Sequence, residues 1–335
     1  MHRLQDARRD PRTADRLILA GIGTHVGRFA PSPTGALHAG SLVAAVASQA
    51  SIRSRAGRFT VRIDDLDVAR VVPGADRAIL QSLRAFGLLD ERTPIVRQAD
   101  RRSCYHEALR VLAQAGLLYR CGCSRRQLAG HAIYPGTCRG RTLSVSQLEE
   151  RLAGHDRPAG SPAPDGTALR VHLQGTTTFD DAVQGERRVV LERDVGDVIV
   201  LRRDTVIAWP LATAVDDAGA ASEVVRGADL FDPTPAQVAL IERLGRTPPR
   251  YAHVPVLCDR AGRKLGKQTG APALDPDRAL ALLQQVWSFL GQRPFHADSL
   301  DAFHALSPAH WSIERVPAER RRHDPRLAPP RPESS

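Results

Sequence analysis

The stretch GRFAPSPTGALHAGSLVAAVAS, residues 27–48, joins a strand-like start to a long run of small residues through a turn rich in proline and glycine. Two prolines and Gly35 fix a turn with little side-chain bulk, and Gly40 leaves the start of the following helix bare. The N-terminus of a helix presents unpaired N–H groups and the positive end of its dipole, which suits a phosphate. His38 stands at this entrance, within reach of a bound phosphoryl group. The stretch therefore predicts a strand, a turn and a helix, read either as a nucleotide site or as ordinary chain reversal.

Outward from this stretch, strand and helix patterns alternate along the chain. The expected elements are a strand at 25–30, a helix at 41–55, a strand at 58–63, and helices at 74–86 and 103–115. Alternation of this kind predicts an α/β fold with a doubly wound parallel sheet.

The composition changes along the chain and suggests where its units meet. Three cysteines, a loop-prone stretch and short strand patterns follow residue 116, and longer strand and helix patterns return near 191. The last residues have the composition of a disordered tail. We expect a mobile arm at 1–24, a nucleotide-binding domain at 25–115 and 191–245, an insertion at 116–190, a Lys loop with a small helical segment at 246–320, and a tail at 321–335.

Composition and charge limit the class of protein. The 335 residues suffice for a large core, and no run of eighteen apolar residues predicts a membrane span. The polar N-terminus lacks the apolar stretch of a signal peptide, so we expect a cytoplasmic protein, in which five cysteines indicate metal or free thiols. A net charge of +10 indicates either a nucleic-acid partner or a high-GC genome, which favours arginine over lysine.

A second motif is VRIDDLDVAR, residues 61–70, in which three aspartates follow an apolar strand. Ligands of open α/β sheets bind at the carboxyl ends of the strands. Carboxylates placed there can hold an ammonium group or a metal. Solvated aspartates of a turn are the alternative interpretation.

A third motif is CDRAGRKLGKQTGAP, residues 258–272, which contains the only two lysines of the chain, Lys264 and Lys267. The lysine ammonium is a compact charge on a flexible side chain, whereas the arginine guanidinium is planar. A glycine-rich loop that carries two of them can reach over a triphosphate and neutralise developing charge. A solvated basic loop is the alternative.

A fourth motif is YRCGCSRRQLAGHAIYPGTCRG, residues 119–140, where Cys121, Cys123 and Cys138 cluster. Three thiolates are typical ligands of a tetrahedral zinc ion. Tyr134 or His131 is the candidate for the fourth position. We expect a structural metal because no general base accompanies the cluster, and buried free thiols are the alternative.

The four stretches occur together in one order, and that combination resembles a known family. FAPSPTGALHAGSL resembles the His-x-Gly signature of class I aminoacyl-tRNA synthetases in the glutamyl form, and RIDDLDVARVVPG is similar to its acidic motif. VVRGADLFDPTPAQ resembles the amino-acid-binding segment, and KLGKQ the mobile Lys loop. The resemblance covers residues 25–290 and implies a Rossmann-like catalytic domain.

Length separates the branches of this family. Full glutamyl-tRNA synthetases continue into a large helical anticodon-binding region, whereas 67 residues follow Gln268 here. With its cysteine cluster, the chain is similar to the glutamyl-Q tRNA(Asp) synthetases. The resemblance implies tRNA-independent activation of L-glutamate with ATP and its transfer to the queuosine base in the anticodon of tRNA(Asp). A shortened enzyme that charges a tRNA 3′ end and a non-catalytic RNA-binding paralogue are the alternatives.

The same resemblance implies roles for single residues. Glutamate would be held by Arg28, Phe29, Ala30, Pro31, Ser32, Asp64, Trp209 and Arg226. ATP, accompanied by Mg²⁺, would be held by His38, Gly40, Lys264 and Lys267, of which His38 and Lys267 are catalytic. Structural zinc would be bound by Cys121, Cys123, Tyr134 and Cys138, and we expect a monomer.

Three positions depart from the family pattern. The family usually has Glu at the position of Asp64, Tyr at that of Trp209 and Ser at that of Gly266. Asp64 is one methylene shorter, and Trp209 keeps a ring but lacks the hydroxyl.

Overall fold

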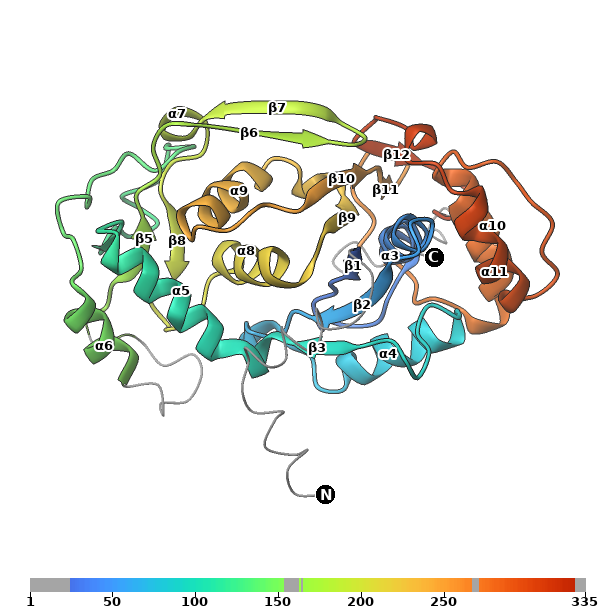
Figure 1. Ribbon diagram of the computed structural model, residues 1–335, viewed down its shortest axis with the longest axis horizontal. Helices are drawn as coiled ribbons and strands as arrows, with labels where there is room; N and C mark the ends of the chain where they lie inside the picture. The colour runs from blue at the N-terminus through green and yellow to red at the C-terminus, as the bar shows by residue number, and fades with distance from the viewer. Residues whose placement is uncertain (1–24, 154–162, 164, 267–270, 329–335) are drawn as a thin grey trace, which may run out of the picture.

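The computed structural model describes residues 25–153, 163, 165–266 and 271–328 (Figure 1). Its centre is a seven-stranded sheet with the strand order β3-β2-β1-β9-β10-β6-β7. The strands are β1 (Val26–Phe29), β2 (Arg58–Ile63), β3 (Ile95–Arg97), β6 (Thr176–Asp181), β7 (Gly185–Val190), β9 (Glu223–Gly227) and β10 (Arg250–Val254). All neighbours pair in parallel except β6 and β7, which form a hairpin. The predicted doubly wound parallel sheet is confirmed.

Helices cover both faces of this sheet (Figure 1). The helices are α3 (Ala39–Arg53), α4 (Ala75–Ala85), α5 (Arg102–Gln114), α6 (Val145–Ala153), α7 (Leu191–Asp194), α8 (Trp209–Ala220), α9 (Thr234–Arg243), α10 (Ala279–Phe289) and α11 (Leu300–His310). One buried apolar cluster joins α3, α4 and α10 to the sheet, and another joins α5, α8 and α9. These are the two largest buried clusters of the described residues.

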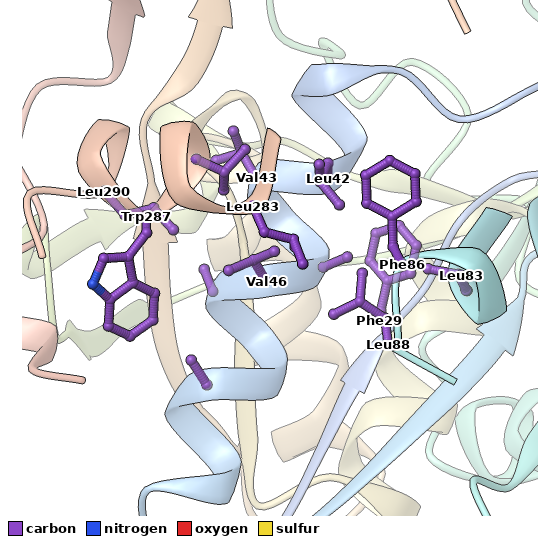
Figure 2. Close-up of a cluster of buried hydrophobic side chains, with 14 of the residues drawn as sticks. Phe29, Leu42, Val43, Val46, Leu83, Phe86, Leu88, Leu283, Trp287 and Leu290 are labelled. Atoms are coloured by element: carbon purple, nitrogen blue, oxygen red, sulfur yellow. The ribbon is translucent and has the colours of Figure 1, made fainter. Parts of the chain in front are cut away.

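Helix α3 is the central element of the first core (Figure 2). Its residues Leu42, Val43 and Val46 are almost fully buried, and they belong to the same cluster as Leu283 and Trp287 of α10. Removing a buried leucine side chain from such a core costs about 2–5 kcal/mol. This packing holds the start of α3, and with it the turn that follows β1, in a fixed position.

The predicted insertion at 116–190 needs a correction. Strands β4 (Leu118–Cys121), β5 (Ala168–Val171) and β8 (Val198–Leu201) form a separate antiparallel sheet, so one of its strands lies beyond residue 190. The β6–β7 hairpin, which falls inside the predicted insertion, extends the main sheet beside β10 instead. The alternating burial of β6 predicts a strand, but it does not reveal which open sheet edge the strand joins.

The predicted disordered tail also needs a correction. Residues 321–328 are ordered, and β12 (Arg321–His323) pairs in parallel with β11 (Val256–Cys258). Backbone hydrogen bonds make this pairing, so the basic and mostly exposed side chains of β12 gave no indication of it. The predicted arm at 1–24 and residues 329–335 lie outside the described residues.

Short 3-10 helices complete the described fold: η1 (Val68–Arg70), η2 (Gln98–Arg101), η4 (Ala228–Leu230), η6 (Pro276–Arg278) and η7 (Ile313–Arg315). Across the part of the chain that the structure describes, no helix has both the length and the apolar character needed to cross a bilayer.

Candidate active site

A cavity lies at the point where the strand order of the main sheet reverses. The chain continues from β1 to β2 on one side and from β9 to β10 on the other, so β1 and β9 flank the topological switch. Ligands of open α/β sheets bind at this place, outside the carboxyl ends of the strands. The cavity measures about 220 Å³. Among its lining residues are Arg28, Phe29, Ala30, His38, Gly40, Asp64, Trp209, Arg226 and Lys264, all of them predicted site residues.

Two of the predicted site residues that the structure describes, Pro31 and Ser32, are not among the lining residues of this cavity. Ser32 lines a neighbouring cavity. The carbonyl of Pro31 accepts a hydrogen bond from the backbone N–H of Asp64, at 3.0 Å, so Pro31 acts through the backbone. Lys267 lies outside the described residues.

His38 and Gly40 form the start of α3. His38 is the N-cap of the helix, and its Nδ1 accepts a hydrogen bond from the backbone N–H of Ser41 at 3.3 Å. The ring proton is therefore on Nε2 when the histidine is neutral. A Cβ on Gly40 would lie 3.1 Å from Cε1 of His38 and 3.4 Å from the carbonyl oxygen of Leu265. Glycine thus lets the helix entrance, the histidine and the Lys loop approach closely.

A buried ion network lines the other end of the cavity. Arg28 of β1 donates two hydrogen bonds to Asp217 of α8, at 3.1 and 2.9 Å. Arg62 of β2 donates to Asp217 at 2.6 Å and to Asp64 at 2.6 Å. Asp216, the neighbour of Asp217, accepts from Gln98, Arg101 and Tyr105. Each charged group is oriented by another group of the same chain, so the wall is rigid.

Charge in this network shifts two carboxyl pKa values in opposite directions. Burial raises the pKa of Asp64 to about 6, because it and the neighbouring Asp216 and Asp217 together outweigh Arg62. Burial also opposes ionisation of Asp217, but Arg28 and Arg62 hold its pKa well below the usual range. Asp217 is therefore a permanent anion, whereas Asp64 titrates near neutrality.

Arg226, at the end of β9, has one unused donor. Its Nε donates to Nε2 of His253 at 3.0 Å, and its Nη2 donates to Thr234 and Gln237 at 2.8 and 2.6 Å. Its Nη1 is buried and has no hydrogen-bond partner among the described residues. Burial, together with nearby Arg28, lowers the pKa of Arg226 to about 10, so the group is still charged at neutral pH. The residue Arg226 lines the cavity, and a buried guanidinium in a cavity wall suits an anionic ligand.

His253 and Asp181 orient the side chain of Arg226 through successive hydrogen bonds. Nδ1 of His253 lies 2.5 Å from the carboxylate of Asp181. Burial lowers the pKa of His253, so the ring is neutral and carries its proton on Nδ1. The ring then donates to Asp181 and accepts from Arg226, which links β6, β10 and β9 in one line.

The Lys loop contacts the segment after β9. Nζ of Lys264 pairs with the carboxylate of Asp229, and both residues line the cavity. This pair connects the stretch that follows β11 to η4. The described part of the loop therefore forms part of the cavity wall.

Asp181, Asp216, Asp217 and His253 were not among the predicted site residues. A signal was available for the adjacent aspartates, because they stand alone as charges in the otherwise apolar stretch WPLATAVDDAGA. Burial of two carboxylates in such a helix requires partners of opposite charge. His253 and Asp181 gave no comparable signal, since they meet through the pairing of β10 with β6.

The cysteine cluster lies at the end of β4, a strand of the three-stranded sheet β4-β5-β8. The Sγ atoms of Cys121, Cys123 and Cys138 all lie within 4.8 Å of one another. Sulfur atoms around a tetrahedral zinc ion are about 3.8 Å apart, given Zn–S bonds of about 2.3 Å. The Sγ atoms of Cys123 and Cys138 lie 3.5 Å apart, and no disulfide joins these cysteines. The three sulfurs thus match a metal site.

Tyr134, rather than His131, is the fourth group at the cluster. Its Oη lies 3.5 Å from Sγ of Cys121 and 3.8 Å from that of Cys123. The guanidinium of Arg170 stacks 3.9 Å over the tyrosine ring. Burial opposes ionisation of Cys121, but hydrogen bonds from Tyr134 and Arg170 bring the pKa of its thiol down to about 7. A thiolate, the form that binds metal, is accessible at neutral pH.

Comparison with known proteins agrees with this architecture. Residues 25–277 match the family of catalytic domains described as tRNA synthetases class I (E and Q). A glutamyl-Q tRNA(Asp) synthetase from Pseudomonas aeruginosa is 43% identical over 301 residues, which cover 88% of this chain and 96% of the relative. The chain belongs to the glutamyl-Q tRNA(Asp) synthetase family. Relatives of the same name from Dechloromonas aromatica and Chromobacterium violaceum are 44% and 42% identical, with 96% and 95% of each covered.

Solved structures show the same fold. The glutamate-tRNA synthetase of Elizabethkingia anophelis superimposes with a TM-score of 0.70 at 21% identity, over 91% of this chain and 69% of that one. A glutamate tRNA ligase of Elizabethkingia meningosepticum, solved with its amino acid, gives a TM-score of 0.69 over 89% and 66%. The Rossmann-like catalytic domain expected from the sequence is confirmed.

Proposed function

We propose that this protein activates L-glutamate with ATP, without help from tRNA, and transfers the glutamyl group to the queuosine base in the anticodon of tRNA(Asp). The names of the relatives, which match over nearly their full length, support the substrates. The buried guanidinium of Arg226 in the cavity wall is the observation that carries the amino-acid site.

In this proposal the ion network and Arg226 hold glutamate. The guanidinium of Arg226 takes a carboxylate, and Arg28 adds a second guanidinium to the same wall. Asp64 faces the ammonium group, and Trp209 supplies an apolar wall. Phe29 and Ala30 line the same end, whereas Pro31 and Ser32 shape the turn.

ATP occupies the other end, with its phosphates at the start of α3. A carboxylate oxygen of glutamate attacks the α-phosphorus, the new P–O bond forms, and pyrophosphate leaves with the electrons of the broken bond. His38 donates from Nε2 to a phosphoryl oxygen, and Gly40 leaves room for it. Lys264 and Lys267 neutralise the charge that grows on the phosphates. Mg²⁺ accompanies ATP as its counter-ion.

The second step forms an ester. A hydroxyl of the queuosine base attacks the glutamyl carbonyl, AMP leaves with the electron pair of the broken bond, and the hydroxyl proton is released. The basic surface of the chain, with its net charge of +10, suits the RNA. A monomer in the cytoplasm is the state we propose.

Zinc is proposed as a structural ion. Cys121, Cys123, Cys138 and the oxygen of Tyr134 would hold it, because their atoms already gather at one point. The ion would tie the end of β4 to the loop that follows it. It supplies local stability, not chemistry, in this scheme.

Mass spectrometry of tRNA(Asp) after incubation with ATP and glutamate tests the proposal. The expected result is a glutamyl mass increase on the anticodon nucleotide that carries queuosine, with none on tRNA(Asp) that has guanosine there. Glutamate found on the 3′ terminal nucleotide would identify an ordinary glutamyl enzyme. Failure of glutamate to drive ATP–pyrophosphate exchange would identify an RNA-binding protein without this activity.

A further inference from the structure

A second cavity adjoins the amino-acid end of the first. It measures about 210 Å³, and two residues, Asp64 and Trp209, line both cavities. It lies between the acidic turn that follows β2 and the connection from β8 to α8. Nothing in the proposed binding of glutamate or ATP uses this space.

The place of this cavity suits the group that accepts glutamate. His38, Gly40 and Lys264, which serve ATP in the proposed function, line the first cavity but not the second. A group in the second cavity meets the amino acid across Asp64 and Trp209, on the side away from the nucleotide. An acceptor must approach the glutamyl carbonyl without crossing the leaving AMP. This side meets that requirement.

The lining combines apolar side chains with arginines. Leu66, Ile207 and Trp209 form apolar and aromatic parts of the wall. One carboxylate oxygen of Asp67 accepts from Arg70 at 2.8 Å and from Arg202 at 2.7 Å. Proteins recognise unstacked RNA bases through aromatic side chains and arginine, and they hold the backbone through basic groups.

The rim of the cavity narrows the occupant further. The side chain of Arg70 is 68% exposed at its mouth. Val68 and Val72, on either side of Arg70 in the chain, are 52% and 46% exposed. The exposed guanidinium can bind a phosphate, and the exposed valines can contact the face of a base. This rim therefore suits RNA.

We infer that the second cavity receives the acceptor nucleoside of the RNA, with its base beside Trp209 and Ile207 and a neighbouring phosphate on Arg70. The inference rests on the proposed function, because it assumes that the acceptor is a base lifted out of an anticodon loop. Asp67 pairs with both Arg70 and Arg202 at the mouth, and Asp64 belongs to the wall that the two cavities share.

Arg70→Ala, Arg70→Glu and Arg70→Lys test the phosphate contact. A charged hydrogen bond contributes about 1.5–3 kcal/mol, so Arg70→Ala should raise the KM for tRNA about tenfold or more. Arg70→Glu should raise it further, and Arg70→Lys should recover part of the loss. Glutamate-dependent ATP–pyrophosphate exchange should not change in any of them. Arg193→Ala is the matched control, since Arg193 is 74% exposed and paired with the adjacent Asp194, yet lies on α7.

Ile207→Phe tests the cavity itself by placing a ring inside it. We expect transfer to be lost while exchange is retained. The outcomes separate the two ideas. Wild-type protein that does not glutamylate the queuosine base refutes the proposed function. Normal transfer in Arg70→Glu, or loss of exchange in that variant, overturns the inference alone, and an effect confined to 3′-end charging assigns the cavity to a terminal nucleoside instead.

Discussion

Asp64 has to be ionised to bind an ammonium group, yet its surroundings favour the neutral acid. Burial raises its pKa to about 6 even though Arg62 donates to it at 2.6 Å. A bound ammonium would restore the charged form, because an opposite charge within a few ångströms lowers a carboxyl pKa. Binding of the substrate and ionisation of Asp64 are therefore coupled.

This coupling predicts an acid limb in the pH profile. Below pH 6 the free enzyme carries a protonated Asp64, so kcat/KM for glutamate in the exchange reaction should fall about tenfold for each pH unit. Above pH 6 the carboxyl is ionised and the limb should level off. The measurement is exchange at sub-saturating glutamate between pH 5 and pH 8.

Asp64→Asn is the variant that checks the assignment. It should lower kcat/KM at pH 7.5 by about 10²-fold, in line with the loss of a buried charge partner, and flatten the acid limb. A limb that persists in Asp64→Asn would show that another group titrates. Asp65→Asn is the neighbouring control, because Asp65 does not line either cavity.

His253 is a positioning residue whose effect should appear in binding. His253→Phe removes the acceptor for Nε of Arg226 and the side-chain donor for Asp181, which leaves one buried donor and one buried acceptor unpaired. An unsatisfied buried group costs about 1–3 kcal/mol, so KM for glutamate should rise about tenfold. His253→Gln, whose amide oxygen can accept from Arg226, should recover part of the loss.

Measuring KM and kcat separately checks whether His253 acts in binding or in the chemical step. A fall in kcat with constant KM would mean that His253 acts in the chemical step. His323→Phe is the control, since His323 hydrogen-bonds a backbone carbonyl on β11 and lies outside the cavity.

At the scale of elements, we expect the stability of the three-stranded sheet β4-β5-β8 to depend on the cysteine cluster. Cys121 ends β4, and Cys123 and Cys138 lie in the loop beyond it, where few apolar side chains are buried. Metal binding supplies folding free energy to such a segment. Cys123→Ser should therefore lose the ion and lower stability, measured as zinc content by elemental analysis and as Tm. Carefully purified wild-type protein without zinc would contradict the prediction.

The Lys loop offers a prediction on chemistry. In the proposed mechanism Lys267 neutralises charge that grows only on the way to the transition state, so Lys267→Ala should slow activation about 10²–10³-fold with little change in KM for glutamate. Stopped-flow measurement of adenylate formation gives the rate. A higher KM with unchanged kcat would make Lys267 a ground-state contact.

Elements could be predicted from the sequence better than their partners could. The turn after β1 and the start of α3 followed from the prolines, Gly40 and His38, because local chemistry specifies them. The sheet position of β6 and the pairing of β12 did not, since both depend on which distant edge is open. The same limit applied to Arg62 and Asp217, which lie 155 positions apart and meet only in the fold.

At the scale of the whole molecule, the question is whether contacts within the chain or contacts with RNA orient the side chains of the site. Glutamate-binding groups come from β1, β2, β9 and α8, all of which pack in the two largest buried clusters. Asp217 orients Arg28, Arg62 orients Asp64, and His253 orients Arg226. Partners within the chain therefore orient these side chains in the described structure.

The last prediction is that glutamate activation proceeds without tRNA. A protein whose competent state is rarely populated binds its substrate more weakly by that fraction, and a second ligand can remove the deficit. Ordinary glutamyl enzymes, which this chain resembles, generally need bound tRNA to organise the site. Here the orienting partners are intramolecular and buried, so the competent state should already dominate. RNase-treated protein should catalyse ATP–pyrophosphate exchange with glutamate but not with aspartate or glutamine, and added tRNA should change the rate little. Asp217→Asn would release Arg28 and Arg62 together and should weaken exchange whether or not tRNA is present. If exchange appeared only after tRNA was added, the network would have to be completed by the RNA, and the site would work like that of an ordinary glutamyl enzyme.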